Sequence, residues 1–299
     1  TQQRRLAEEI GRKSLKTQWA KRNRSRVKGL QPEDFLWSFP SIVRNIEVLE
    51  DTAKGIGVFT FRPSVDGIVR QVPLVVRVGD VMYPTLALEL YRVATQQTTM
   101  AIDYGPGGIN GVKLKGLEVP TDRFGQIWMK FGKHDRNLYV PAKDILNGTA
   151  DPKKLVGKLA FFGTSAIGLL DIKATPLDAA IPGVEVHAQL LQNILDKNYL
   201  ARPAWALGAE LLAMILVGVL MVLLVPFLGA IWTLVAALVT VAILLAVSWW
   251  VFDAHGLLLD MVFPAIGIFI VTVVLTYLNY VREERERRQV RGAFSRYMS

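Results

Sequence analysis

Three long apolar stretches dominate the last third of the chain. They cover residues 206–225, 227–252 and 261–281. The only charged residue within them is Glu210, near the start of the first stretch. A helix needs about 20 apolar residues to cross the hydrocarbon layer of a membrane, and none of the stretches has a polar face that could meet water. Pro226 and Gly229 separate the first two stretches, and residues 253–256 (Asp-Ala-His-Gly) interrupt the apolar pattern before the third. The pattern predicts three transmembrane helices.

Residues 35–205 instead alternate short β-rich runs with amphipathic helical stretches. The expected strands are Gly55–Phe61, Gln71–Val78, Val81–Tyr83, Gly125–Phe131 and Lys158–Phe162. The pair Gly79–Asp80 is typical of a two-residue hairpin turn. Helices are expected over residues 84–94, with a stripe of Leu86, Leu90 and Val93, and over Gly183–Asp196, with a stripe of His187, Leu190, Leu191, Ile194 and Leu195. The predicted fold class is an α/β domain followed by an all-α bundle of three transmembrane helices.

The net charge of +9 is unevenly distributed. Residues 1–34 hold 10 basic and 4 acidic side chains, and residues 282–299 hold 6 and 3, so the two ends carry +6 and +3. Because this excess flanks an apolar block, we expect a lipid bilayer as partner and no nucleic acid. Residues 1–34 form a basic N-terminal segment, whose first 30 residues are expected to be a helix or a mobile segment that faces either solvent or anionic lipid.

The arginines directly after the third stretch orient the predicted spans. They are Arg282, Arg285, Arg287, Arg288 and Arg291. Positive residues close to a span stay in the cytoplasm, so residues 282–299 are expected inside and residues 1–205 outside. The loop Asp253–Asp260, which contains only acidic charges, then lies outside as well. An exported domain needs a route across the membrane, and we therefore expect a further span before residue 1.

Several motifs suggest sites, each with a structural alternative. Asp66-Gly67 can form a turn, and Arg70 can pair back to Asp66 or to another acid. Asp171, followed by Thr175-Pro176, comes after the expected strand Lys158–Phe162, where loop carboxylates bind ligands in open α/β sheets or tie loops down. These residues are candidate sensor or structural positions.

The remaining candidates are weaker. His187 lies on an apolar helix stripe, where it is either a core residue or a ligand. The run Gly163–Gly168 has the spacing G-x-S-x-x-G, which differs from a nucleophile elbow and favours a tight turn. The glycines of 105–111 likewise favour a turn over a phosphate site. The chain has no cysteine, and its three histidines lack metal-ligand spacing, so we expect neither a disulfide nor a metal site.

Four segments follow one another along the chain: Val65–Arg70 with Pro73–Leu74; Tyr83–Glu89; Gly157–Ala166 with Gly168, Asp171, Thr175 and Pro176; and Pro182–Ala188, which includes Gly183 and His187. In this order and spacing they resemble the CHASE type-two extracytoplasmic sensor family. Three closely spaced spans after the domain are also like that family. The resemblance covers about residues 35–281 and implies a sensor domain over 35–205. Residues 1–34 do not resemble the family's first portion, so the domain is expected to lack strands and to leave a sheet edge unpaired.

Residues 291–299 resemble the segment that leads into class III nucleotide cyclase domains. This implies the sensory and membrane-spanning part of a bacterial adenylate or guanylate cyclase receptor, a homodimer in the inner membrane whose residues 282–299 form a cytoplasmic signalling helix. Nothing in the chain matches the catalytic residues of such enzymes, so ATP and divalent metal are expected only in a catalytic domain outside it. Two alternatives stay open: a non-catalytic membrane subunit that clamps other membrane proteins, and the sensor part of a histidine kinase.

Overall fold

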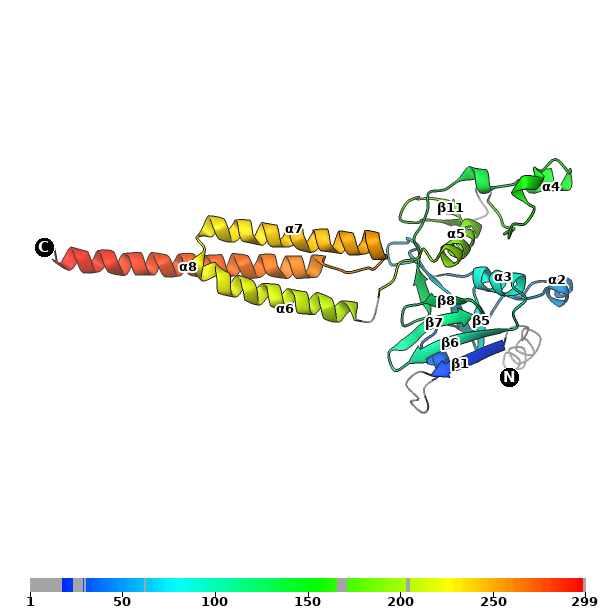
Figure 1. The fold of residues 1–299 in the computed structure, drawn as a ribbon, viewed down its shortest axis with the longest axis horizontal. Helices are drawn as coiled ribbons and strands as arrows, with labels where there is room; N and C mark the ends of the chain where they lie inside the picture. The colour runs from blue at the N-terminus through cyan, green and yellow to red at the C-terminus, as the bar shows by residue number, and fades with distance from the viewer. Residues whose placement is uncertain are drawn as a thin grey trace. The chain divides into compact units, whose positions relative to one another are not determined.

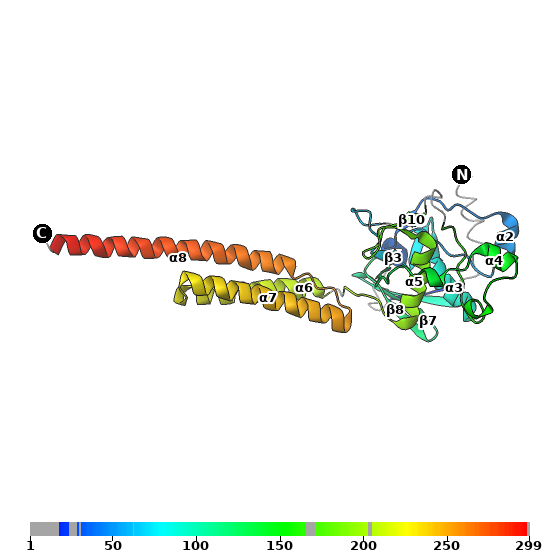
Figure 2. The same cartoon turned by 90° about the horizontal axis from the view of Figure 1, so that it is seen from above.

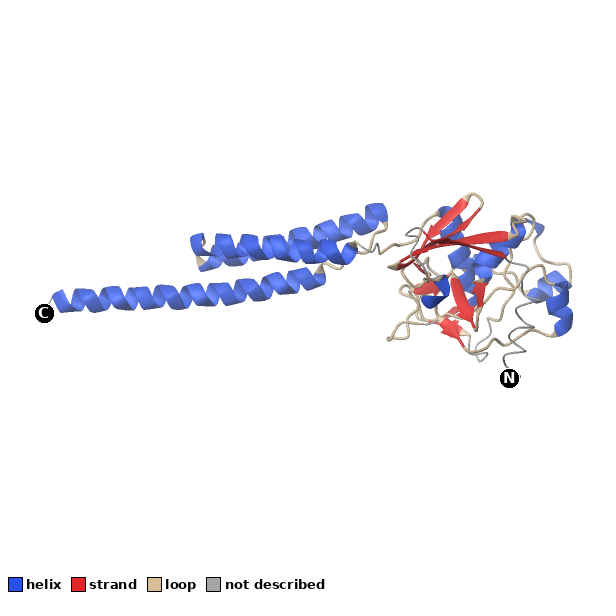
Figure 3. Ribbon diagram, turned by 90° about the horizontal axis from the view of Figure 1, so that it is seen from below, coloured by secondary structure: helices blue, strands red, loops and turns tan. Residues whose placement is uncertain are grey.

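The chain divides into a strand-rich unit, Thr1–Ala201, and a helical unit, Arg202–Ser299 (Figure 3). We describe them in a computed structural model, which covers residues 18–23, 29, 31–61, 63–165, 171–202 and 205–297. The order of strands, short helices and three long apolar helices confirms the predicted fold class, an α/β domain followed by a helical bundle.

The largest sheet of the first unit has the strand order β1-β6-β7-β8 (Figure 1). Its strands are β1 (Gln18–Asn23), β6 (Thr99–Gly105), β7 (Gly108–Leu114) and β8 (Leu117–Pro120). β1 runs parallel to β6, and the other neighbours are antiparallel. β6 and β7 are joined by a tight turn at 105–108, as the glycine-rich sequence predicted. β1 occupies the edge beside β6, so the expected helix or mobile segment is wrong for residues 18–23.

Three smaller sheets complete the described part of the strand-rich unit. β2 (Ser38–Phe39), β4 (Val75–Val78) and β5 (Val81–Pro84) form one, β3 (Gln71–Pro73) and β9 (Gln126–Trp128) a second, and β10 (Ile172–Lys173) and β11 (Ile181–Pro182) a third. The predicted hairpin at Gly79–Asp80 is confirmed between β4 and β5, with Gly79 at a φ of 58°. Leu74 splits the predicted strand Gln71–Val78, because its amide donates to Gly125 (2.9 Å) while its carbonyl accepts from Thr85 (2.8 Å).

Two helices supply most of the helical contribution to the core. They are α3 (Leu86–Ala94) and α5 (Gly183–Asp196), which contact each other and lie over the same face of the main sheet (Figure 1). α5 has the predicted bounds, and its predicted stripe is buried except for Leu195. α3 starts two residues later than expected, because Pro84 ends β5, and it buries Ala87, Leu88, Glu89 and Arg92 rather than the predicted stripe. The short helices α2 (Glu47–Thr52) and α4 (Ala142–Leu146), and the 3-10 turns η1 (Pro32–Asp34), η2 (Arg136–Leu138) and η3 (Pro152–Lys154), complete the unit.

Three predicted strands are wrong or shorter than expected. Lys158–Phe162 forms no strand: Phe161 packs against the core, whereas Phe162 is 89% exposed. An apolar run becomes a strand only where a ladder partner is present, and these residues pair with none of the described segments. Gly55–Phe61 makes only an isolated bridge at Val58. The run Gly125–Phe131 gives just β9 as a strand.

The helical unit consists of α6 (Ala206–Leu224), α7 (Ala230–His255) and α8 (Val262–Tyr297), with the 3-10 turn η4 (Val225–Phe227) between α6 and α7. Each of the three contains a segment long and apolar enough to cross a membrane. Met221, Ala237 and Ile268 form a small buried cluster that joins the three helices. α8 is the longest, with 36 residues, and Figure 2 shows it continuing past the ends of its two neighbours.

Candidate functional site

The Asp66 motif forms a self-contained turn. The Asp66 carboxylate accepts hydrogen bonds from Arg70 Nη1 (2.9 Å) and Nη2 (2.7 Å) and from the Ile68 amide (3.1 Å). The pairing of Arg70 with Asp66, one of the two partners considered, is therefore confirmed. Gly67 takes a φ of 79°, which an Asp-Gly turn requires. The Arg70 hydrogen bonds lower the pKa of Asp66 to about 2. The turn is exposed, and its two charged side chains neutralise each other.

The second motif surrounds the start of α5. The Asp171 carbonyl accepts the Gly183 amide (2.8 Å), and the Asp171 carboxylate pairs with Lys173 (3.2 Å). A Cβ at Gly183 would lie 2.4 Å from Asp171 Oδ1, so glycine lets this carboxylate approach the positive end of the helix dipole. Thr175 closes a turn by accepting the Asp178 amide (3.1 Å), and Pro176 lies exposed within that turn.

His187 joins α5 to the segment that contains Phe59, 128 residues earlier in the chain. Its side chain is buried, with 3% exposed. Because a carbonyl only accepts, Nε2 is the protonated nitrogen that donates to Phe59 (2.9 Å). The ring packs at 5.5 Å from Phe61, and Nδ1 has no hydrogen-bond partner among the described residues. Burial lowers the pKa of His187, which keeps the imidazole neutral and fits a core position.

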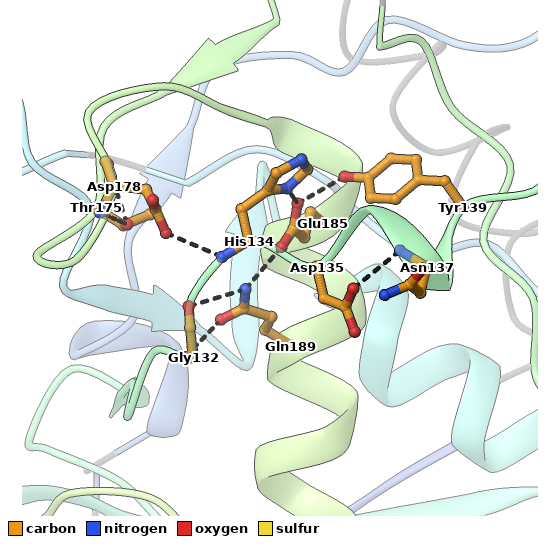
Figure 4. A network of polar contacts seen from close by, with 9 residues as sticks. All are labelled: Gly132, His134, Asp135, Asn137, Tyr139, Thr175, Asp178, Glu185 and Gln189. Atoms are coloured by element: carbon orange, nitrogen blue, oxygen red, sulfur yellow. Dashed lines mark hydrogen bonds and ion pairs between the residues drawn. The ribbon is translucent and has the colours of Figure 1, made fainter.

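Sequence reasoning missed the polar face of the same helix. Glu185, Gln189 and Asn193 are spaced by four residues, so they lie on one face of α5, and all three are buried. Their side chains reach the extended segment that follows β9, and Figure 4 shows this for Glu185 and Gln189. The spacing is visible in the sequence, but buried polar residues need partners, and the sequence alone does not reveal which backbone supplies them.

The amide side chains of this face hold the backbone of residues 130–132. Asn193 accepts the Lys130 amide (2.8 Å) and donates to the Lys130 carbonyl (3.1 Å). Gln189 makes the same pair of contacts with Gly132 (3.0 and 3.3 Å). Four helical residues rise about 6.0 Å, and two extended residues about 6.6 Å. The two repeats match, so the helix replaces a strand as the hydrogen-bonding partner. We call Glu185, Gln189 and Asn193 the α5 ladder.

Glu185 ends the ladder with three side-chain partners. It contacts His134 Nδ1 (2.5 Å) and accepts from Tyr139 Oη (2.6 Å) and Gln189 Nε2 (2.9 Å). Burial and the hydrogen bond to Glu185 raise the pKa of Tyr139. The His134 amide donates to Asp178 Oδ2 (3.0 Å), which connects this segment to the Thr175 turn (Figure 4).

The structure therefore brings part of the predicted motif together. Thr175 reaches the ladder through Asp178 and His134, and Gly183 and His187 share α5 with it. The Asp66 turn closes on itself. The predicted motif Gly163–Gly168 extends beyond the described residues. No group of three or more metal-ligating side chains occurs in the described residues. Because the ladder's polar groups bind other parts of the same unit, the arrangement holds Lys130, Gly132, His134 and Tyr139 against α5.

The comparisons agree with this architecture. The family model described as CHASE2 domain matches residues 2–225. The match includes nearly all of the basic segment 1–34, which we expected to lie outside the resemblance, and ends just after α6. No curated protein and no solved structure matches the chain. With a match over most of its length, the chain belongs to the CHASE2 family, and it joins an extracytoplasmic sensor domain to three helices that can anchor it in a membrane.

Proposed function

We propose that this chain is the sensory and membrane-spanning part of a bacterial receptor that passes an extracytoplasmic stimulus to a cytoplasmic effector domain. The effector in this proposal is a class III adenylate or guanylate cyclase, which follows α8. A CHASE2 sensor domain and three helices of membrane-spanning length support the sensing and anchoring parts of the proposal. The resemblance of residues 291–299 to the segment before class III cyclase domains supports the effector.

One observation carries the proposal: α8 is a single helix from Val262 to Tyr297. Its 36 residues rise about 54 Å at 1.5 Å each, whereas the hydrocarbon layer is about 30 Å thick. The candidate span ends at Arg282, and the helix continues through the charged stretch beyond it. The pair Arg288–Glu284, one turn apart at 3.0 Å, supports this exposed part. An unbroken helix can carry a shift or rotation from the span to whatever follows.

The charges around the helices support the proposed orientation. Arg282, Arg285 and Arg288 follow the third span, and the loop between α7 and α8 contains only acidic charge. By the positive-inside rule these charges support a cytoplasmic C-terminus and a periplasmic strand-rich unit. The bilayer is the inner membrane in this proposal. A homodimer would let two effector domains meet, and a stimulus must then favour one arrangement of the pair over the other.

The test is a fusion of the chain, inserted in the inner membrane, to a class III cyclase domain at the end of α8. Deleting the strand-rich unit should change cyclic nucleotide output, and unchanged output would contradict the proposal. Insertions near Gln289 provide a matched comparison. One extra residue turns the following domain by about 100°, whereas seven residues restore nearly the same phase. The single insertion should alter output, and the seven-residue insertion should retain it.

A further inference from the structure

A buried carboxylate lies in the first turns of α6. Glu210 is 6% exposed and is the only charged residue of this helix. Arg202, the first residue of the helical unit, donates from Nη2 to both Glu210 oxygens (3.2 and 3.0 Å). The Asp260 amide donates to Glu210 Oε1 (2.7 Å). One side chain therefore joins the segment before α6 to the segment before α8.

The linker between α7 and α8 is held on a second side. Ser248 Oγ of α7 donates to the Leu259 carbonyl (2.9 Å). Asp260 Oδ1 accepts the Val262 amide (3.1 Å) and so satisfies the first backbone amide of α8, which has no partner within the helix. Asp260 therefore binds Glu210 through its backbone amide and the start of α8 through its side chain. A displacement at Glu210 acts directly on the beginning of the longest helix.

Because the Glu210 carboxylate is buried, its stability depends on the Arg202 guanidinium that pairs with it. A buried carboxylate that loses its cationic partner is strongly destabilised, because the remaining charge has lost its compensation. The Arg202 side chain is 37% exposed, compared with 8% for Glu210, so Arg202 can move more readily than the carboxylate that it binds. The other acceptor contact, from the Asp260 amide, carries no full charge and cannot replace the guanidinium. The position of Arg202 therefore decides how Glu210 is held.

We propose that Glu210 is the positioning residue that couples the chain leaving the sensor domain to the start of α8. Arg202 comes directly after the strand-rich unit, which ends at Ala201. Through Glu210, in the first turns of α6, and Asp260, a movement there reaches α8 without travelling the length of α6 and α7. This inference rests on the proposed function for its purpose, since it gives the receptor its input connection. The contacts themselves need no effector domain and can be tested without one.

The absence of cysteine from the sequence makes a site-specific label straightforward. A nitroxide is attached at Phe263→Cys, an exposed position in the first turn of α8, in the full chain in lipid nanodiscs. Spin-label mobility is then compared in the parent, Arg202→Ala, Glu210→Gln and the double variant. Arg288→Ala is the matched control, because it removes an arginine from an exposed ion pair at the far end of α8.

Each single change should increase label mobility at position 263, and the double variant should add little to either one, because both changes break one connection. The control should leave the spectrum unchanged. An unchanged spectrum in both single variants, or fully additive effects, would overturn the proposal. Arg202→Lys, which keeps the charge, should fall between the parent and Arg202→Ala, and it covers the case in which the alanine variant does not fold. The readout uses no cyclase, so a silent fusion receptor would count against the proposed function alone.

Discussion

Asn193→Ala tests the α5 ladder most cleanly. Asn193 makes two hydrogen bonds to the backbone of Lys130. Because these bonds use backbone atoms of Lys130, a change of the Lys130 side chain would not remove them. Alanine keeps the helix and deletes only the side-chain amide. The change should therefore release the first residue of the held segment while α5 stays folded.

The structure sets the expected size of the effect. The two hydrogen bonds to Lys130 contribute about 1 kcal/mol each, so the contact with Lys130 loses about 2 kcal/mol. The third bond of the side chain, from Nδ2 to the Gln189 carbonyl (2.9 Å), lies within α5, where the higher helix propensity of alanine, roughly 0.5 kcal/mol, partly offsets its loss. Since 1.4 kcal/mol corresponds to a factor of ten, the Lys130 amide should exchange its hydrogen more than about ten times faster.

The assay is hydrogen exchange by mass spectrometry on peptides that cover residues 129–134 of the full chain. Gln192→Ala is the control, because Gln192 is exposed on the same helix one residue away. The control should leave the exchange of these peptides unchanged. If Asn193→Ala also left it unchanged, or if both variants accelerated it equally, the reasoning about the ladder would be refuted.

The remaining predictions concern buried groups of the strand-rich unit. Burial lowers the pKa of His187 below its ordinary 6.5, so the unfolded chain takes up this proton first and stability should fall as pH drops below that value, by at most about 1.4 kcal/mol per pH unit. His187→Gln, which keeps a donor, should show a shallower acid slope in thermal unfolding between pH 7 and 5; an unchanged slope would contradict the assignment. Gly57→Ala places a Cβ 2.6 Å from the Leu86 Cα and should destabilise the unit by about 1–3 kcal/mol. For Gly183→Ala the three nearest atoms all belong to the movable Asp171 carboxyl group, so this change should cost less than Gly57→Ala in the same unfolding assay.

The sequence patterns that succeeded were those with strong local causes. The three apolar stretches predicted helices because their length and composition leave no alternative environment. The bounds of α5 followed from its 3.6-residue stripe. The hairpin at Gly79–Asp80 and the turn at Asp66 followed from local backbone chemistry.

The failures have a non-local cause. Lys158–Phe162 has the composition of a buried strand, but no described segment supplies its ladder partner. Gln18–Asn23 has the composition of a solvated basic segment, yet β6 lies beside it and makes it a strand. The α5 ladder was missed for the same reason, since Glu185, Gln189 and Asn193 find their partners 46 to 63 residues away. Long-range partners are set by the whole fold rather than by local pattern.

The central claim is that lipid surrounds the three long helices and that the sensor domain lies on the opposite side of the membrane from the arginine-rich end of α8. Single cysteines at exposed Val156 and at exposed Arg288 test it directly, because the sequence supplies no other thiol. Intact cells, with the outer membrane made permeable, are treated with a maleimide that cannot cross the inner membrane. Val156→Cys should be labelled, and Arg288→Cys only after lysis. Labelling of Arg288→Cys in intact cells, or protection of Val156→Cys, would contradict the account.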